Sequence, residues 1–307
     1  MSRWALPLLA VCLSALPLWA VPKGGQALQR ARLAERSYDY VGTQVVRTIG
    51  RRQMQAEVVV AHLKRGITCH RFTSPPPMAG HRSFVTPHHR MHFTPGPGRW
   101  SRVLPQPEAT GNLPLLLRNY HLLDQGTDTV AGRTTHVFLV QPRRPGNPSK
   151  RLWLDQDTGL LLKSVLRNWQ GKPVSEMEFR EIKIARDLPE AAQQCRRPEQ
   201  VPPRPALPPL GFSPLQPGYV PEGYEYQGQS ALAIRGKPAA HLRYSDGLNT
   251  ISLFQQPGPP AFRESAGLRD MGFSQLVYRR VGEINVVVFA DLPPDQLRRI
   301  VDSLPGG

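Results

Sequence analysis

The stretch from residue 150 to residue 184 constrains the fold more than any other part of the chain. Three runs typical of strands, 150–155, 160–168 and 174–184, are separated by two short polar turns that each contain a glycine. This spacing predicts two consecutive hairpins, which form an antiparallel meander. In the third run Met177 and Phe179 alternate with charged residues, so one face is apolar and the other is wet. A helix, a second sheet or an apolar ligand has to cover the apolar face.

The composition is that of a folded protein with a strong basic excess. The 307 residues suffice for one large or two ordinary domains. Lys and Arg number 39 against 23 Asp and Glu, which gives a net charge of +16. Such a charge permits contact with lipid A, acidic protein segments or nucleic acid, although the compositional bias of an Arg- and Pro-rich proteome explains it equally well. The basic residues are scattered and lack the aromatic spacing of a stacking platform, so no nucleic-acid partner is expected.

Residues 1–20 have the pattern of an export signal. Arg3 supplies the positive start, residues 4–16 are apolar, and Ala20 is the small residue that a signal peptidase needs. The apolar run is short for a membrane span, and a lipidated Cys12 is the weaker alternative because Val11 precedes it. We expect a cleaved signal and a periplasmic mature protein.

Two cysteines remain in the chain after residue 20. Cys69 and Cys195 are a candidate disulfide, because exported proteins form such bridges. Two unpaired thiols are the alternative. The bridge would join a strand of the first half to the end of the first domain.

Local patterns predict the elements of the first half. Residues 26–36 predict a helix, and 38–47, 56–64, 67–73 and 134–141 predict strands. The segment 74–100 is dense in Pro, Gly and His, which excludes a helix or a central strand and predicts loops around short edge strands near 84–85 and 90–94. Residues 113–123 predict a helix with Pro114 in its first turn.

A proline-rich segment divides the chain. Residues 196–217 predict a semi-rigid, extended linker between a domain at 21–195 and a smaller one at 218–307. The smaller domain carries an Asp-Gly hairpin turn at 245–248 and a terminal helix over 291–304, with Pro in its first turn. Its strands are predicted over 231–234, 241–244, 251–254, 276–281 and 285–290.

The sequence carries no convincing catalytic or metal-binding motif. His81, His88, His89 and His92 lack a Cys or an acid at a familiar spacing, so the pattern favours a solvated His-rich loop over a metal site. Gly-x-Ser-x-Gly and Gly-rich phosphate motifs are missing, and the acids of 176–181 look like the wet face of a strand. We expect a binding or regulatory protein rather than an enzyme, with no cofactor.

Six short motifs occur in a specific order along nearly all of the mature chain. They are Ser37–Thr43, Leu152–Asp155, Asp157–Lys163, Tyr219–Tyr224, Tyr244–Leu248 and Asp291–Pro294. In this combination the chain resembles the MucB/RseB family of periplasmic sigma-E regulators. The resemblance implies an α+β protein. Its N-terminal domain would be a curved antiparallel half-barrel sheet wrapped around helices, as in LolA and LppX, and its smaller α/β C-terminal domain would end in a helix.

The resemblance also implies a function. Family members bind the extracytoplasmic part of a membrane anti-sigma factor and limit its proteolysis, and lipopolysaccharide or mislocalised lipoprotein releases them. The alternative is a periplasmic lipid or lipoprotein carrier of the LolA type. Such carriers usually stop after the first domain, so residues 218–307 favour the regulator. Whether the protein forms a homodimer is left open.

Two sets of residues are candidates for binding. An apolar ligand face that accepts lipid or acyl chains would use one set, although ordinary core is the alternative for each member: Trp153, Leu161, Val165, Met177 and Phe179. An acidic partner would meet the other set, although a solvated surface is the alternative: Arg279, Arg280, Arg298 and Arg299.

Overall fold

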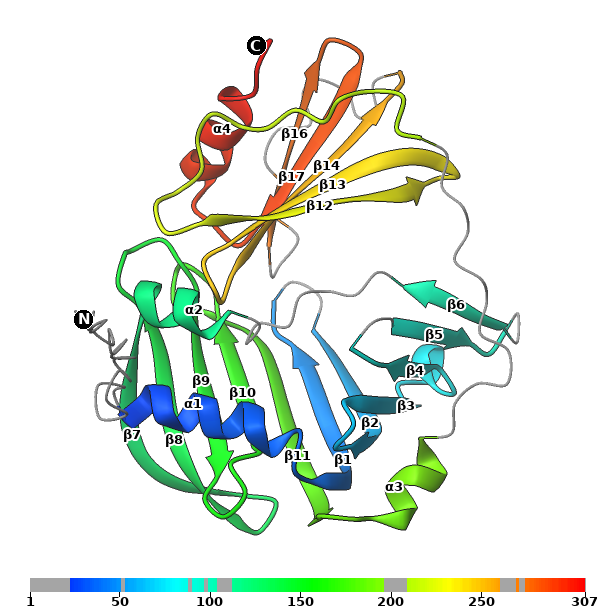
Figure 1. The fold of residues 1–307 in the computed structure, drawn as a ribbon, viewed down its shortest axis with the longest axis vertical. Coiled ribbons are helices and arrows are strands. Elements are labelled where there is room, and N and C mark those ends of the chain that lie inside the picture. Colours follow the sequence, from blue (N-terminus) through cyan, green and yellow to red (C-terminus); the bar gives the residue numbers. More distant parts are fainter. Residues whose placement is uncertain are drawn as a thin grey trace, which may run out of the picture.

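The computed structural model describes two antiparallel sheets, one above the other in Figure 1. The described residues are 23–50, 53–87, 90–96, 99–103, 112–195, 209–259, 269–270 and 274–306. The predicted signal at 1–20, most of the predicted linker (196–208), His88 and His89 lie outside them. Within these ranges, no helix has the length and apolar character that a bilayer span requires.

The larger sheet is curved and has eleven strands in the order β6-β5-β4-β3-β2-β1-β11-β10-β9-β8-β7. They are β1 (Asp39–Thr48), β2 (Met54–Leu63), β3 (Ile67–Ser74), β4 (Arg82–Val85), β5 (Arg90–Thr94), β6 (Arg99–Val103), β7 (Tyr120–Val130), β8 (Arg133–Pro142), β9 (Ser149–Asp155), β10 (Leu161–Arg167) and β11 (Pro173–Ala185). The predicted meander is confirmed as β9, β10 and β11. Two meanders meet where β1 pairs with β11, with Asp39 opposite Ala185.

Helices cover the apolar face that the sequence left open. α1 (Lys23–Ala34) runs across strands β7 to β10 in Figure 1, and α2 (Leu113–Asn119) lies near its start. Leu28 of α1 and Leu116 of α2 pack into one cluster with buried residues of β8 and β9. This burial of apolar surface holds both helices on the sheet. α3 (Pro189–Gln194) instead contacts β1 and β2.

The helix predicted over 113–123 is wrong in its second half. α2 has the expected first turn, where the Asn112 side chain accepts a hydrogen bond from Leu115 N at 3.0 Å. It ends at Asn119, and residues 120–130 form the edge strand β7, paired with β8. The apolar spacing of 113–123 suits a helix, but pairing with β8 and burial of Tyr120 override that local preference.

The proline-rich segment contains more strand than predicted, but at the expected place. β4 and β5 confirm two short strands at the predicted places, but they are not edge strands, because β5 pairs with β6 and β6 forms the edge of the sheet. A short 3-10 turn, η2 (Pro76–Met78), precedes β4. The prolines of this segment are tolerated because they fall between the strands, where no ladder hydrogen bond has to be donated.

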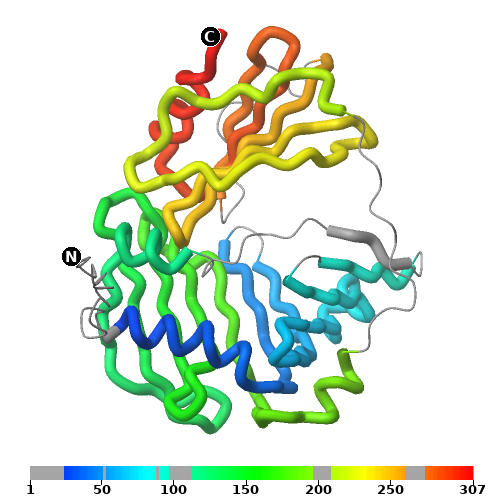
Figure 2. The backbone as a smooth tube through the Cα atoms, viewed as in Figure 1, coloured from blue at the N-terminus to red at the C-terminus, as the bar shows by residue number. Residues whose placement is uncertain are grey.

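The smaller sheet has six strands in the order β12-β13-β14-β17-β16-β15. They are β12 (Glu225–Ile234), β13 (Lys237–Ser245), β14 (Thr250–Pro257), β15 (Arg269–Asp270), β16 (Gln275–Val281) and β17 (Ile284–Ala290), followed by α4 (Pro294–Asp302). α4 buries Leu297, Ile300 and Val301 against one face of this sheet. Figure 2 shows residues 209–224 crossing the same face, where Leu210, Phe212 and Leu215 pack on the core.

Cys69 of β3 and Cys195, which ends α3, form a disulfide with a Cα–Cα distance of 5.4 Å. Cys195 is buried beside Ala61, Phe84 and Met91. The bridge therefore ties the end of α3 to β3 of the larger sheet.

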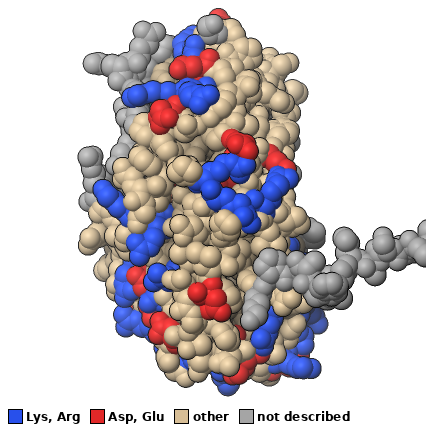
Figure 3. Space-filling view, turned by 90° about the vertical axis from the view of Figure 1, so that its left-hand side faces the viewer, with Lys and Arg blue, Asp and Glu red and all other residues tan. Residues whose placement is uncertain are grey.

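Charged side chains are distributed rather than concentrated. On the side seen in Figure 3, Lys and Arg are spread over both halves, with Asp and Glu between them. This distribution agrees with the scattered basic residues of the sequence and differs from the continuous basic stripe typical of nucleic-acid binding.

Candidate functional site

A buried polar junction joins the two sheets. Asn119, at the end of α2, donates from Nδ2 to Gly223 O and to Asp246 O, both at 2.9 Å. The next residue, Tyr120, donates its hydroxyl proton to Asp246 Oδ2 at 2.6 Å. Both carbonyls and the carboxylate belong to turns of the smaller sheet. We call Asn119, Tyr120, Gly223, Tyr224, Asp246, Gly247, Asn249 and Asp291 the junction.

Asp246 organises the hairpin turn between β13 and β14. Its Oδ1 accepts hydrogen bonds from Leu248 N at 2.9 Å and Asn249 N at 2.7 Å. Burial raises the pKa of Asp246, against the lowering effect of the hydrogen bond from Tyr120 and the two backbone donors. Burial and the nearby Asp246 in turn raise the pKa of Tyr120, so its proton stays in this hydrogen bond.

A glycine lets the same turn approach α2. Gly247 has a φ of +101°, and a Cβ built on it would lie 2.5 Å from Leu116 N and 2.6 Å from Leu116 Cα. Gly223 is similarly close, since its Cβ would lie 2.4 Å from Asn119 Oδ1. A side chain at Gly247 would meet the backbone of α2 and force the two sheets apart, whereas one at Gly223 would displace the Asn119 side chain from its hydrogen bonds.

Two ion pairs flank the buried core of the junction. Arg118 pairs with Glu225, and Arg144 pairs with Glu222. All four side chains are at least 40% exposed, so each pair contributes little to stability and mainly fixes orientation.

Asp291 is the unusual member of the junction. Asn249 Nδ2 donates to the Asp291 backbone oxygen at 2.8 Å and to Tyr224 Oη at 2.8 Å. The Asp291 carboxylate receives only a long hydrogen bond from Trp169 N at 3.5 Å, and its buried Oδ2 has no partner in the described part of the chain. Burial raises the pKa of Asp291 to about 7, against the smaller lowering effect of the Trp169 backbone bond.

This carboxylate should make stability depend on pH. An unfolded aspartate titrates near pH 4, so between about pH 4 and 7 the folded state holds a proton that the unfolded state has lost. We therefore expect stability to fall as pH rises through this range. Asp291→Asn should remove most of that slope and raise the free energy of unfolding at pH 8 by about 2 kcal/mol, since water still reaches part of the site.

Urea unfolding at pH 5 and pH 8 measures this effect. Asp295→Asn, on the exposed side of α4, is the matched control and should leave the slope unchanged. Asp246 should contribute a smaller decrease of stability with rising pH that persists in the Asp291→Asn variant, because the pKa of Asp246 is also raised. An Asp291→Asn variant that keeps the full slope would contradict the assignment.

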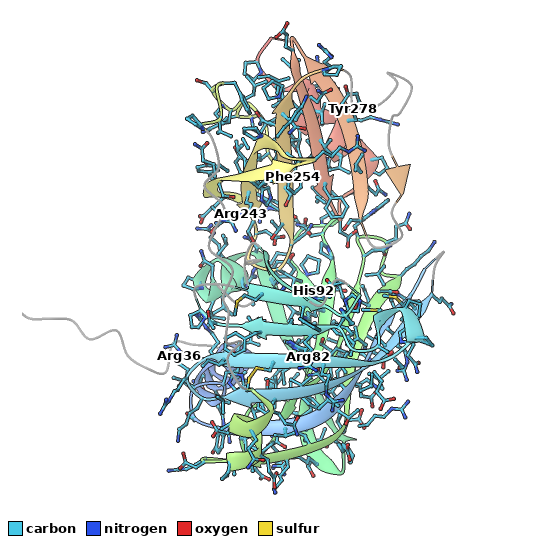
Figure 4. All side chains as sticks on the ribbon, turned by 90° about the vertical axis from the view of Figure 1, so that its right-hand side faces the viewer. Arg36, Arg82, His92, Arg243, Phe254 and Tyr278 are labelled. Carbon is cyan, nitrogen blue, oxygen red and sulfur yellow. A yellow bond between two sulfur atoms is a disulfide. The ribbon has the colours of Figure 1, made fainter. Side chains whose placement is uncertain are left out.

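The second feature is the face of the smaller sheet opposite α4, which we call the outer face. By strand register it carries His241, Arg243, Ser252, Phe254, Leu276, Tyr278, Val287 and Phe289. Directly paired residues share a face, and these residues alternate with the buried ones that pack under α4. Figure 4 looks onto this side, with Tyr278, Phe254 and Arg243 on the upper sheet above His92 and Arg82.

The outer face combines aromatic surface with unsatisfied polar atoms. The His241 ring stacks on Phe254, with centroids 4.3 Å apart. Burial and the neighbouring Arg243 lower the pKa of His241 to about 4, so it is neutral at pH 7. Arg243 Nε and His241 Nε2 are buried and lack hydrogen-bond partners in the described part of the chain. Because Arg243 Nε is itself buried, a docked partner would meet the exposed part of the half-buried Arg243 side chain instead.

The four arginines predicted to meet a partner have different environments. Arg279 donates to Val301 O and pairs with Asp302, so it holds α4 on the sheet. Arg280 donates to Gly258 O and Gly282 O, and the Arg299 guanidinium lies 4.1 Å from the centre of the Tyr219 ring. Arg298 is exposed on α4. The structure does not bring the four together as one patch.

Four of the five apolar candidates, Trp153, Val165, Met177 and Phe179, belong to one hydrophobic cluster, although strand register divides them between the two sides of the larger sheet. Trp153 pairs with Lys163, whereas its neighbour Leu152 pairs with Ser164, which pairs with Met177. Trp153 and Met177 therefore point to opposite sides. Val165 lies on the side of Trp153, Phe179 on that of Met177, and Leu161 packs in the cluster under α1.

Metal-ligating residues do not gather in threes or more within the described ranges. Two of the four histidines noted in the sequence do meet: His81 Nδ1 lies 2.9 Å from His92 Nε2.

Comparison with known proteins assigns this chain to a protein family. The MucB/RseB N-terminal domain model matches residues 79–198, and the MucB/RseB C-terminal domain model matches residues 212–305. The two matches together cover more than half of the chain. The chain belongs to the MucB/RseB family. The resemblance expected from the six motifs is thereby confirmed.

Individual members of the MucB/RseB family are similar to different extents. The sigma factor AlgU regulatory protein MucB of Pseudomonas aeruginosa is 31% identical over 144 residues, which are 45% of this chain and 44% of that protein. The matched region thus spans less than half of that relative. A crystal structure of MucB in complex with MucA(peri) has a TM-score of 0.70 at 21% identity, covering 92% of this chain and 99% of that one. A crystal structure of MucB alone has a TM-score of 0.57 at 21% identity, covering 92% of this chain and 97% of that one. These likenesses establish the shared fold.

Sequence reasoning missed the junction, although its residues were in view. Three of the six motifs that carry the MucB/RseB resemblance contain Gly223, Asp246, Gly247 or Asp291. A buried Asp-Gly turn and an isolated buried Asp are unusual enough to suggest a contact. The sequence could not show that their partners would be Asn119 and Tyr120.

Proposed function

We propose that this protein is a periplasmic regulator that binds the extracytoplasmic segment of a membrane anti-sigma factor and limits its proteolysis. Membership of the MucB/RseB family supports the proposal. A structure of the same fold is a complex of MucB with MucA(peri), which makes an anti-sigma segment the partner to test first. We further propose that lipopolysaccharide, lipid or lipoprotein acyl chains act as the releasing signal.

The outer face of the C-terminal sheet is the proposed docking surface. Phe254 and Arg243 are half-buried, so they have apolar area and charge left to offer. Arg243 has no carboxylate partner among the residues described, and the chain as a whole is strongly basic. A partner segment with an acidic residue beside an apolar one would satisfy both side chains. This unsatisfied arginine beside a stacked aromatic pair is the observation that carries the choice of surface.

The carrier alternative has less support from the packing. A ligand chain held as in a carrier of the LolA type would enter between α1 and the sheet. A hollow of about 630 Å³ at the C-terminal end of α1 is lined mostly by polar and charged residues such as Arg30, Lys64 and Asp187. The apolar space between α1 and the sheet is about 60 Å³, lined by Leu28, Leu152, Leu154 and Lys150 among others. That volume suits a few water molecules, whereas ligand pockets usually measure about 300 Å³ or more. Burial lowers the pKa of Lys150, which lines this space.

Calorimetric titration of residues 21–307 with the periplasmic segment of the host's anti-sigma factor tests the regulator proposal. We expect micromolar or tighter binding. Phe254→Ala should weaken it by roughly tenfold or more, because truncating a central aromatic anchor typically costs about 2 kcal/mol. Arg243→Gln should weaken it and reduce its dependence on salt.

Tyr226→Ala is the matched control. Tyr226 is 43% exposed and packs against Tyr244, away from the outer face, so its loss should change affinity by less than about twofold. Equal effects of Phe254→Ala and Tyr226→Ala would rule out the docking surface while leaving the regulator proposal intact. Failure of the folded protein to bind any such segment would reject the regulator itself, and co-purified lipid would then be sought.

A further inference from the structure

Two histidines that are distant in sequence meet at the edge of the larger sheet. His81 follows the η2 turn and His92 lies in β5. His81 Nδ1 and His92 Nε2 are 2.9 Å apart, and the ring centroids are 5.1 Å apart. Both rings are half-buried at the surface, in the part of the molecule where Figure 4 labels His92.

The backbone of both histidines is held in place by hydrogen bonds. His81 O accepts from Phe72 N at 2.9 Å, and His81 N donates to Met78 O at 3.1 Å. His92 pairs with Ser83 across the β4–β5 ladder. Ser83 is fixed in turn, because its hydroxyl lies 2.8 Å from His70 Nδ1. The two imidazoles are therefore presented by a rigid strand framework, which is what a pre-organised site requires.

We propose that His81 and His92 form a binding site for a borderline divalent transition metal, with Cu(II) preferred over Zn(II). Imidazole nitrogens bind such ions at about 2.0–2.1 Å, so two of them in neighbouring positions of a tetragonal ion lie about 2.9 Å apart. The observed separation is that of a hydrogen bond between the two rings, and it already brings the two nitrogens as close together as neighbouring ligands of one ion. Among these ions Cu(II) leads in intrinsic affinity for nitrogen sites, which is the reason for the stated preference.

The site is a two-imidazole site with water in its remaining positions. In the metal-free pair, one facing nitrogen donates a proton to the other. Binding requires both facing nitrogens to be unprotonated, so that proton shifts to the far nitrogen of its own ring. Each ring coordinates as a neutral tautomer, and no net proton is released. The rings tilt about their side-chain torsions so that both lone pairs point at the ion.

Titration of metal-free residues 21–307 with Cu(II) alone, followed by calorimetry and electron paramagnetic resonance, tests the proposal. We expect one equivalent of Cu(II) with hyperfine structure from two nitrogens, and weaker binding of Zn(II). His81→Asn and His92→Gln should each weaken Cu(II) binding at least tenfold, and the double variant should bind no more weakly than either single variant. A shared site predicts this non-additivity.

Two controls separate this site from other histidines. His136→Gln, in β8, should leave Cu(II) binding unchanged. His88→Gln combined with His89→Gln should also leave the first equivalent in place. Loss of that equivalent in this double variant, with binding retained by His81→Asn and His92→Gln, would overturn the proposal.

A measurement on the unmodified chain tests the site without substitutions, in case a variant fails to fold. Diethyl pyrocarbonate modifies accessible imidazoles, and mass spectrometry locates the products. One equivalent of Cu(II) should protect His81 and His92 and leave His121, which is exposed, reactive. Equal protection of all three histidines would point to unspecific binding and overturn the assignment.

Discussion

Replacing Gly247 by alanine should lower the free energy of unfolding by about 3 kcal/mol. The new Cβ would lie 2.5–2.6 Å from Leu116 N and Cα, and 3.0 Å from Leu115 C. These are backbone atoms of α2, so no side-chain rotation relieves the overlap, and overpacking costs about 1–3 kcal/mol. A φ of +101° adds about 1–2 kcal/mol of backbone strain for any residue with a side chain.

Gly236→Ala separates the two costs. Gly236 lies in the β12–β13 turn with a φ of +78°, and a Cβ added there would meet nothing within 4 Å among the described residues. It should show the strain alone, about 1 kcal/mol. Urea unfolding gives both values, and limited proteolysis should detect exposure of α2 only in Gly247→Ala. Equal destabilisation by the two variants would mean that the turn yields without disturbing the junction.

Removing the disulfide should have the second large effect. Cys69 and Cys195 are 126 residues apart in sequence, and closing so long a loop restricts the unfolded chain strongly. We expect Cys69→Ser to lower the free energy of unfolding by about 2–4 kcal/mol. Cys195→Ser should cost slightly more, because it places a hydroxyl in the apolar cluster around Phe84 and Met91.

Chemical reduction supplies an independent comparison. Dithiothreitol should destabilise the unmodified protein by about the same amount as Cys69→Ser and should leave the double serine variant unaffected. The effect should appear as earlier proteolysis around α3 and β3, with the C-terminal sheet unchanged. An unmodified protein that is indifferent to reduction would contradict the stabilising role.

The meander could be predicted because its signal is local. Alternation in β11 and glycine turns on either side of β10 are readable from neighbouring residues. The end of α2 could not be predicted in this way, because Tyr120 leaves the helix for a contact with Asp246, 126 residues further along. The choice between helix and strand at 120–123 depends on β8 and on the C-terminal half together.

Several motif residues hold elements of the fold together through hydrogen bonds and do not serve as binding groups. Asp39 accepts hydrogen bonds from Lys64 N and Leu188 N, so it fixes the β2–β3 turn and the start of α3 to β1. The Asp155 carboxylate accepts a hydrogen bond from Thr158 N at 2.8 Å, which closes the β9–β10 turn. A sequence motif can show that such a residue is important. Its structural role becomes clear only when its hydrogen-bond partner is known. For this reason the family was readable from the sequence, whereas the junction and the outer face were not.

The central pairing of β1 with β11 has a consequence for how the chain folds. β1 finds β2 at once, but its other neighbour is the last strand of the larger sheet to be synthesised. Contact order is therefore high at the middle of the sheet, and folding should be slow compared with that of a simple meander. Until β11 arrives, β1 is an open strand edge in a nascent chain, which is the kind of surface that chaperones must shield from aggregation.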